Sequence, residues 1–382
     1  MDSEATPVVG MVGAGQLARM TSGAATELGI RFRVLAAAAD ESAAQVTVDP
    51  FLGDYRSEAD LAAFAVGCDV VTFDHEHVPG PLIASLEAAG RVVHPGSAAL
   101  RYTQDKLEMR AHLTSLGYRC PAFEPVASLA EVEGFAAKTG WPVVLKAVTG
   151  GYDGRGVWVC EDAEAAASVL AHGLQLIAEE YVRFSRELAI LVARGPRGHG
   201  AAYPVVETVQ RDGICLEVIA PAPDLRPAAA SDAQRLGLSI ARDLDVVGLL
   251  AVELFETADG LLVNELAMRP HNSGHWTMDG SLTSQFEQHL RAVLNLPLGS
   301  PMAVARWTVM VNILGGSDPE LRSRLVHVMA ADPAVKVHLY GKLVRPGRKV
   351  GHVTALGRDL DQTRDRAWRA ASYLAYGTEE YQ

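Results

Sequence analysis

The stretch Pro7–Leu17, PVVGMVGAGQL, predicts how the first part of the chain folds. A short apolar run, a turn with two glycines and the start of a helix follow one another in the order of a βα unit. Apolar runs and helical patterns go on alternating as far as the strands expected in CDVVTFDHEHVP (68–79) and RVVHPG (91–96). Such alternation is typical of a parallel, doubly wound sheet. We therefore expect an α/β, Rossmann-like N-terminal domain over residues 1–104.

After residue 104 the pattern changes to α+β, beginning with a helix expected over Asp105–Leu116. Strands are expected in WPVVLKAV (141–148), GVWVCED (156–162), LQLIAEEYV (174–182) and ELAILVAR (187–194). A Pro/Ala-rich connector (221–232), a helix over Asp232–Leu244 and a hairpin over 249–266 complete a second domain, 105–300, with a small subdomain at about 120–187. Past Pro297–Pro301, strands in WTVMVNILG (307–315) and VRPGRKVGHV (344–353) and a last helix predict a small C-terminal domain, 301–382.

The composition is that of a globular protein, with 49% hydrophobic and 21% charged residues. The net charge of −12 argues against nucleic acid or an anionic membrane as partner, because both need a basic face. A small anionic ligand is still compatible, since it responds to local charge. The acidic start MDSEATPVV, the absence of a membrane-length apolar run and the lack of a CxxC pair predict a cytoplasmic protein with reduced cysteines. The cysteines are Cys68, Cys120, Cys160 and Cys215.

A glycine-rich loop, TGGYDGRG (149–156), follows the strand that ends near Lys146. Backbone N–H groups of such a loop can close on phosphate oxygens, whereas a plain hairpin loop would use the glycines only for their backbone freedom. Two features favour the phosphate flap. The loop carries Tyr152, Asp153 and Arg155, which a turn does not need. A lysine at the end of an apolar strand also suits a point-charge contact with phosphate.

Two carboxylates are expected to face each other on a hairpin. LLAVELFE (249–256) and LLVNEL (261–266) flank a three-residue loop, Ala258-Asp259-Gly260, whose register sets Glu253 opposite Glu265. Like charges directly opposite are destabilising unless a cation lies between them. A register different by one residue would instead leave one Glu in solvent. With Asn264 nearby, we favour a Mg²⁺ site shared with nucleotide phosphates.

The hairpin runs into the polar stretch NELAMRPHNSGHW (264–276). His271 and His275 have the spacing of a helical zinc pair, but the Asn-Ser-Gly between them disfavours a helix and no Glu follows His271. The stretch instead offers hydrogen-bond donors to an anionic substrate beside the metal. These donors are Arg269, His271, Asn272 and Ser273. A second phosphate contact is plausible at the basic turn VRPGRKVGH (344–352).

Several motifs together resemble the 5-(carboxyamino)imidazole ribonucleotide synthase family, the ATP-grasp ligases of de novo purine biosynthesis. They are GQLARM (15–20), TGGYDGRG (149–156), NELAMRPHNSGHW followed by TSQFEQHLRAVLNLPLG (264–276 and 283–299), and RPGRKVGH (345–352). The resemblance extends from about residue 8 to about residue 355. It implies an ATP-grasp fold between a pre-ATP-grasp domain and a small C-terminal domain. It also implies that ATP and Mg²⁺ activate bicarbonate to carboxyphosphate, which carboxylates the amine of 5-aminoimidazole ribonucleotide.

The family's functional residues carry over to matching positions of this chain. The resemblance implies nucleotide contacts from Arg101, Lys146, the flap residues Gly151, Tyr152, Asp153, Gly154, Arg155 and Gly156, the hinge Glu179, Glu180, Tyr181 and Val182, and Glu187, Gln210, Asn264 and Glu265. Mg²⁺ ligands would be Glu253 and Glu265. Substrate contacts would come from Gln16, Glu76, Tyr152, Arg155, Asn272, Ser273, Arg348 and Lys349, and the catalytic residues would be Asp153, Arg269, His271 and Lys349. Asp153 is expected to orient the attacking amine.

The chain departs from the family pattern at four places. Ala18 replaces a Gly, Asp74-His75-Glu76-His77 replaces EFEN, Met268 replaces a Pro and Gln210 replaces a His common near the nucleotide. None of these changes removes a cation, a metal carboxylate or the flap. We expect an active enzyme, altered at most in its affinities.

Three other functions are compatible with parts of the sequence. An ATP-grasp ligase with another acyl donor or amine would share every motif except the substrate loop. An NAD-dependent oxidoreductase would use the Gly13–Gly15 turn, with Asp40 as ribose partner, and would leave the flap and the Glu pair unexplained. A catalytically silent ATP-binding regulator would not need the carboxylates. The family further implies a homodimer.

Overall fold

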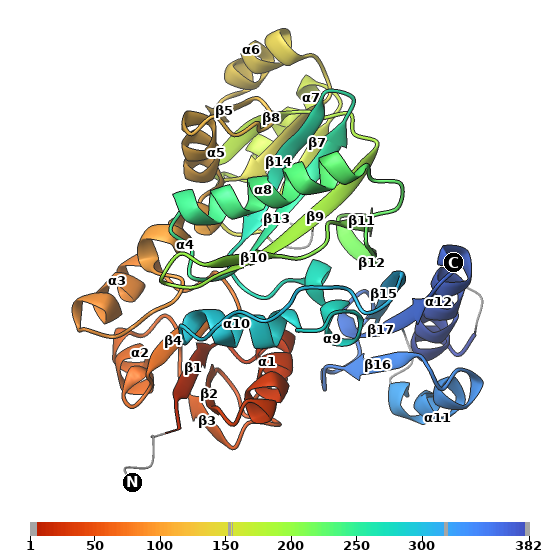
Figure 1. Ribbon diagram of the computed structural model, residues 1–382. Coiled ribbons are helices and arrows are strands. Elements are labelled where there is room, and N and C mark those ends of the chain that lie inside the picture. The colour runs from red at the N-terminus through yellow and green to blue at the C-terminus, as the bar shows by residue number, and fades with distance from the viewer. Residues whose placement is uncertain (1–5, 152–153, 155, 317–319, 379–382) are drawn as a thin grey trace.

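The computed structural model describes residues 6–151, 154, 156–316 and 320–378. Its N-terminal part is a parallel sheet with the strand order β3-β2-β1-β4 (Figure 1). The elements are β1 (Val8–Val12), α1 (Gln16–Glu27), β2 (Arg31–Ala36), β3 (Asp49–Leu52), α2 (Glu58–Ala65), β4 (Val70–Phe73) and α3 (Gly80–Ala88). Every residue of β1 is buried, as expected of an inner strand in a sheet covered on both faces. The parallel sheet predicted from the sequence is confirmed.

The strand predicted in RVVHPG is wrong as an extended element. Only Val93 pairs, in an isolated parallel bridge with Val71. Pro95 has no N–H with which to continue a ladder, and a helix begins two residues later. The helices here are α4 (Ser97–Gln104) and α5 (Lys106–Ser115), the second of which confirms the helix predicted over Asp105–Leu116.

A four-stranded antiparallel sheet, in the order β5-β8-β6-β7, forms the subdomain at the top of Figure 1. Its elements are β5 (Phe123–Val126), α6 (Leu129–Thr139), β6 (Val143–Ala147), β7 (Val157–Cys160), α7 (Ala163–Leu170) and β8 (Leu176–Glu180). Apolar side chains of both helices and of the strands share one core, including Val132, Phe135, Leu145 and Val169. The strands predicted in this part of the chain are confirmed.

The largest sheet has nine strands, in the order β14-β13-β9-β11-β12-β15-β17-β16, with β10 paired to β9. Its strands are β9 (Arg186–Arg194), β10 (Gly200–Ala202), β11 (Val206–Arg211), β12 (Ile214–Ala220), β13 (Gly248–Thr257), β14 (Gly260–Ala267), β15 (Trp307–Leu314), β16 (Lys336–Leu339) and β17 (Lys349–Gly357). The remaining elements are α8 (Pro227–Asp243), the 3₁₀ turn η1 (Asn272–Gly274), α9 (Thr277–Gly280), α10 (Gln285–Val293), α11 (Leu321–Ala331) and α12 (Leu360–Tyr376). Helices α8 and α10 contact β9 and β13, and α12 covers β15 and β17 (Figure 1).

This sheet crosses the domain boundary expected at residue 300. Strand β12 pairs with β15, so that Glu217 lies opposite Val311. Two hydrogen bonds from Arg364 on α12 reach the buried carboxylate of Glu217, at 2.9 and 2.7 Å, and Trp368 Nε1 donates a third at 3.1 Å. The C-terminal segment is therefore joined to the preceding strands by backbone and by charge. The boundaries at residues 104 and 300 stay a prediction.

The helix expected over Asp232–Leu244 begins earlier, at Pro227. Proline suits the first turn of a helix, where its missing N–H costs no hydrogen bond, and the alanines that follow are strong helix formers. The prediction of a connector up to residue 232 is wrong, because a Pro/Ala-rich composition alone does not distinguish a helix start from a linker.

Candidate active site

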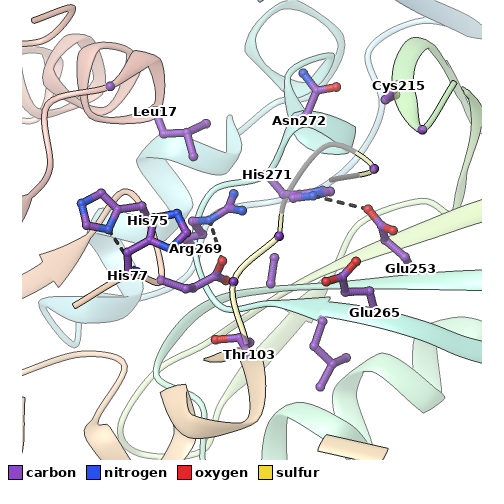
Figure 2. Close-up of a pocket in the computed structure, with 18 of the residues that line it drawn as sticks. Leu17, His75, His77, Thr103, Cys215, Glu253, Glu265, Arg269, His271 and Asn272 are labelled. Atoms are coloured by element: carbon purple, nitrogen blue, oxygen red, sulfur yellow. Dashed lines mark hydrogen bonds and ion pairs between the residues drawn. The ribbon is translucent and has the colours of Figure 1, made fainter. Parts of the chain in front are cut away.

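A cavity of about 1510 Å³ lies between the three parts of the chain (Figure 2). Its size exceeds that of a typical single-ligand pocket and leaves room for a nucleotide and a second substrate. The predicted site residues that line it are Gln16, Glu76, Lys146, Gly151, Gly154, Glu179, Glu180, Tyr181, Val182, Glu187, Gln210, Glu253, Asn264, Glu265, Arg269, His271, Asn272, Ser273, Arg348 and Lys349. Segments far apart in sequence thus converge on one site.

Three of the predicted residues, Tyr152, Asp153 and Arg155, lie outside the described residues. Two others do not line the cavity. Gly156 is part of the strand edge, where its carbonyl accepts from Ala147 N–H at 2.8 Å. Arg101 places its guanidinium over Tyr102, 4.6 Å from the ring centre, and its side chain is half exposed.

The hairpin brings the two predicted carboxylates together by a different turn from the one expected. Thr257 pairs with Gly260, so the loop has two residues, Ala258-Asp259, and the predicted three-residue loop is wrong. A bulge next to Glu253 corrects the register, because Asn264 has no partner on β13. Glu253 therefore still pairs with Glu265.

Ionisation of both carboxylates at once is unfavourable at this position. Burial and then the charge of Glu265 raise the pKa of Glu253 to about 8. Burial alone would raise the pKa of Glu265 as well, but Lys106, whose Nζ is 2.8 Å from Glu265 Oε1, holds that pKa below its usual value. Figure 2 shows both carboxyl groups turned into the cavity, near His271.

The donor set fits a divalent cation that takes part of its coordination from a ligand. Within the described ranges, no group of three or more His, Cys, Asp or Glu side chains is placed to hold a metal alone. Two carboxylates on rigid strands, with the Asn264 amide beside them, suit Mg²⁺ that completes its octahedron with phosphate oxygens and water. The raised pKa of Glu253 is the observation that favours a cation here, because a nearby cation would stabilise the ionised carboxylate.

A buried charge network lies under the predicted phosphate site. Glu179 accepts from Arg110 Nε and Lys146 Nζ, each at 2.7 Å. Burial alone would raise the pKa of Glu179, but these two cations outweigh it and lower the pKa to about 2. Lys146 Nζ also reaches Asn264 Oδ1, at 3.3 Å. The network holds the Lys146 ammonium at the cavity wall, next to the hairpin.

The predicted ribose contact has an unused acceptor. Glu187 lies on β9, and its Oε2 is buried without a hydrogen-bond partner. Burial raises the pKa of Glu187, which a side-chain hydrogen bond with Gln210 lowers in part. A buried, unpaired carboxylate oxygen is costly unless a ligand satisfies it. Vicinal hydroxyl groups would do so.

The described part of the flap has the backbone expected of a hinge. Gly150, Gly151, Gly154 and Gly156 have φ between 73° and 85°. Residues with a Cβ rarely adopt this region, so the glycines are needed for the path of the loop. Gly154 also lies against the β11–β12 turn, where an added Cβ would come within 3.0 Å of Gly213 Cα.

The polar loop after β14 presents His271 to the carboxylates. Burial and the charges of Arg269 and Lys349 lower the pKa of His271 to about 3, so the ring is neutral. Ser273 N–H donates to His271 Nδ1 at 3.4 Å, which leaves the proton on Nε2. That nitrogen lies 3.5 Å from Glu253 Oε1, as the dashed line in Figure 2 shows.

Basic side chains gather at the other end of the cavity. Arg269 Nε donates to Glu76 Oε2 at 3.1 Å. Lys342, Arg345, Arg348 and Lys349 line the cavity from the segment around β17. Lys342 hydrogen-bonds to Gln16 and so joins the last segment to the first helix. These cations suit a phosphate group at this end.

Sequence reasoning missed Lys106, Lys342 and Arg110. Lys106 contacts a carboxylate 159 residues away and Lys342 an amide 326 residues away. No local pattern marks such a contact. The only available signal was for Lys342, a cation three residues before the RPGRKVGH motif, whereas Lys106 and Arg110 lie near no recognised motif.

The Gly13–Gly15 turn lines the cavity but has no free anion site. Gly15 N–H donates to Asp74 Oδ2 at 2.6 Å. Asp74 also occupies the space beside Gly13, where an added Cβ would lie 1.8 Å from Oδ1. Because this carboxylate takes the place of a pyrophosphate, the geometry does not favour a dinucleotide-binding oxidoreductase.

Comparison with known proteins agrees with this geometry. The family model described as ribonucleotide synthetase preATP-grasp domain matches residues 7–104, ATP-grasp domain matches 111–286, and phosphoribosylaminoimidazole carboxylase C-terminal domain matches 308–366. The chain is 54% identical to N5-carboxyaminoimidazole ribonucleotide synthase of Mycobacterium tuberculosis, over 97% of this chain and 88% of that one. The Corynebacterium ammoniagenes relative of the same name is 48% identical, over 96% and 92%.

Solved structures show the same relationship. The N5-carboxyaminoimidazole ribonucleotide synthetase of Thermus thermophilus has a TM-score of 0.87 at 38% identity, covering 96% of this chain and 98% of that one. The Aspergillus clavatus N5-carboxyaminoimidazole synthase, in complex with ADP and 5-aminoimidazole ribonucleotide, has a TM-score of 0.90 at 31% identity, covering 97% and 98%. The chain belongs to the N5-carboxyaminoimidazole ribonucleotide synthase family, and its fold is the ATP-grasp fold of these ligases.

Proposed function

We propose that the cavity catalyses the ATP-dependent carboxylation of 5-aminoimidazole ribonucleotide with bicarbonate, giving N5-carboxyaminoimidazole ribonucleotide, ADP and phosphate. The chain is an ATP-grasp ligase of purine biosynthesis by its family. One observation carries the substrate assignment. A single cavity is lined both by Lys146 and the carboxylate pair, which suit the nucleotide, and by the cations Arg269, Arg348 and Lys349, which suit the ribonucleotide phosphate.

At the nucleotide end, the chain binds and orients ATP. Lys146, held by Glu179, would contact the phosphates, and the flap amides would close over them. Glu187 Oε2 would accept from the ribose hydroxyl groups. The hinge at Glu180–Val182 would read the adenine. Lys106, beside Glu265, adds a cation near the phosphates, and Arg101 would have to move to do the same.

Glu253 and Glu265 would hold Mg²⁺, with Asn264 beside them. When bound by these residues, Mg²⁺ would supply positive charge to the transferring phosphoryl group. A bicarbonate oxygen attacks the γ-phosphorus, the bond to ADP breaks and carboxyphosphate forms. The amine nitrogen then attacks the carboxyl carbon, and phosphate leaves as the amine loses a proton.

The loop at 269–273 would orient the second half of this reaction. The neutral His271, whose Nε2 faces Glu253 at 3.5 Å, would donate to a carboxyl oxygen of the intermediate, and Arg269 is fixed by Glu76. Lys349 and Arg348 would hold the ribonucleotide phosphate, with Gln16, Asn272 and Ser273 around it. Asp153, on the flap, stays our prediction for the group that orients the amine. Closure of the flap would exclude water from the short-lived carboxyphosphate.

The test is ADP release from MgATP in the presence of the ribonucleotide and bicarbonate, each omitted in turn. We expect release to need the ribonucleotide and bicarbonate. Turnover that does not need bicarbonate would favour an ATP-grasp ligase with another acyl donor. No ATP turnover under any condition would contradict the proposal.

The cellular location and the oligomeric state of the enzyme are also part of the proposal. Among the described residues, no helix combines the length and the apolar character needed to cross a membrane. A cytoplasmic location and a homodimer stay predictions, and sedimentation equilibrium of the purified chain tests the second.

A further inference from the structure

Helix α10 is a buried platform behind the substrate loop. Seven of its nine residues are buried, and it lies between α1 and the large sheet (Figure 1). Phe286, Leu290 and Val293 share a core with Leu17 and Met20 of α1. A helix packed on both sides moves little, so side chains that leave it start from a fixed point.

Gln285, at the first position of α10, binds the backbone N–H and C=O of one residue of the substrate loop. Its Oε1 accepts from His271 N–H at 2.8 Å and its Nε2 donates to His271 C=O at 2.8 Å. The side chain has no exposed surface. Gly274 is pressed against the same amide, since an added Cβ there would lie 2.5 Å from Gln285 Oε1. The loop therefore packs against the helix in one defined position.

The second N–H of Gln285 fixes the tautomer of a neighbouring histidine ring. Because Oε1 accepts from the His271 amide, Nε2 is the donor end, and it lies 3.0 Å from His275 Nδ1. His275 must accept there and carry its proton on Nε2. All the donors and acceptors of the Gln285 side-chain amide are thus directed at the loop.

Gln288, one turn further along, makes the same pair of bonds to a different segment. Its Oε1 accepts from Gly299 N–H at 2.7 Å and its Nε2 donates to Gly299 C=O at 2.9 Å. It too is completely buried. Gly299 belongs to the connection before β15 and does not line the cavity. Both glutamines bind the backbone N–H and C=O of one residue, and Gln285 alone also contacts a histidine ring.

We propose that Gln285 is a positioning residue of the ribonucleotide site, which fixes the His271 backbone and with it the direction of the imidazole. This inference rests on the proposed function of His271. With the peptide held by Gln285 and Nδ1 held by Ser273, the ring has one free direction, towards Glu253 and the cavity. Fixing this geometry before the substrate binds should increase the reaction rate, since a displacement of about 1 Å can lower the rate by about 100-fold.

The experiment compares Gln285→Met with Gln288→Met at nearly constant side-chain volume. Each variant removes the two hydrogen bonds to the backbone of one residue, and Gln285→Met also removes the contact with His275 Nδ1. We expect the unfolding temperature to fall in both variants, and at least as far in Gln285→Met. Only Gln285→Met should lower kcat/KM for the ribonucleotide, by about 100-fold, while the Kd for ATP stays unchanged. Gln288→Met should keep both constants. Equal kinetics in the two variants at equal loss of stability would overturn the inference.

Wild-type protein provides two further outcomes. If its ADP release does not depend on the ribonucleotide, the proposed function fails and the inference fails with it. If release is dependent and the two variants behave alike, only the inference fails. Should Gln285→Met not fold, hydrogen exchange decides: the His271 amide should be protected as strongly as the amides of α10, and exchange as fast as in an exposed turn would overturn the clamp.

Discussion

The Gly13–Gly15 turn and the Glu253/Glu265 hairpin both have the sequence pattern of a ligand site, yet they differ in what is left unsatisfied. In the turn, Asp74 accepts from Gly15 N–H and fills the space beside Gly13. In the hairpin, burial and then the repulsion from Glu265 raise the pKa of Glu253 to about 8. The comparison teaches that a motif marks a site when its polar groups still lack partners.

The largest effect should come from the hairpin. Glu265→Gln removes one carboxylate from the pair and weakens the cation site, so we expect kcat/KM to fall by about 100- to 1000-fold. ADP release measures it, and the unfolding temperature separates lost chemistry from lost structure. Asp74→Asn, which keeps an acceptor for Gly15 N–H, should change kcat/KM by less than about tenfold. A larger loss from Asp74→Asn than from Glu265→Gln would break the comparison.

The network behind the hairpin should dominate stability. Arg110 is completely buried and pairs with Glu179, and it also donates to Val263 C=O at 3.0 Å. Arg110→Met leaves the Glu179 carboxylate with one cation, and we expect a loss of about 3 kcal/mol in urea unfolding. Lys138→Met, which breaks the exposed pair with Glu124, should cost less than about 1 kcal/mol. Equal losses would show that burial of the network does not matter.

Acid should weaken the same network over a definite pH range. The pKa of Glu179 falls from 4.5 to about 2 on folding, so its contribution is complete above pH 4.5 and is lost as the pH falls through 2. The full contribution is on the order of 3 kcal/mol. Urea midpoints of wild type and Glu179→Gln, measured between pH 6 and pH 3, should converge as the pH falls. A constant difference would place the pKa of Glu179 elsewhere.

The smallest effect should come from the turn. Asp74→Ala leaves Gly15 N–H without an acceptor, and we expect a loss of about 1–2 kcal/mol in the free energy of unfolding. Titration with NAD should show no binding to wild type, because the carboxylate occupies the anion position. NAD binding to wild type would contradict the assignment of the turn as self-satisfied.

The sequence predicted the outline of the site better than its details. The parallel sheet and the Glu253–Glu265 pair follow from local patterns and are present in the structure, and the described glycines of the predicted flap have positive φ angles. The prediction that Glu253 pairs with Glu265 was right although the predicted turn was wrong, because the bulge at Asn264 cancels the one-residue error in the length of the loop. A bulge depends on the partner strand, so one strand read alone does not reveal it.

Contacts between distant segments were beyond sequence reasoning. The resemblance implies Arg101 as a phosphate contact, whereas the cation beside the carboxylate pair is Lys106. The two lie on successive helices, and only packing decides which side chain reaches Glu265. Gln285 lies within a recognised motif, but the sequence assigns it no role, since its bonds go to a peptide 14 residues earlier.

The uninterrupted sheet limits how this enzyme can be divided. A chain cut at residue 300 would expose the edge of β12 as a row of unpaired N–H and C=O groups, a template for aggregation. It would also remove Arg364 and Trp368, which bind the Glu217 carboxylate. Chimeras between relatives should therefore take β12 and β15 from the same parent. Recombination at the apparent domain boundary would join two halves of one sheet that had never been selected to pair.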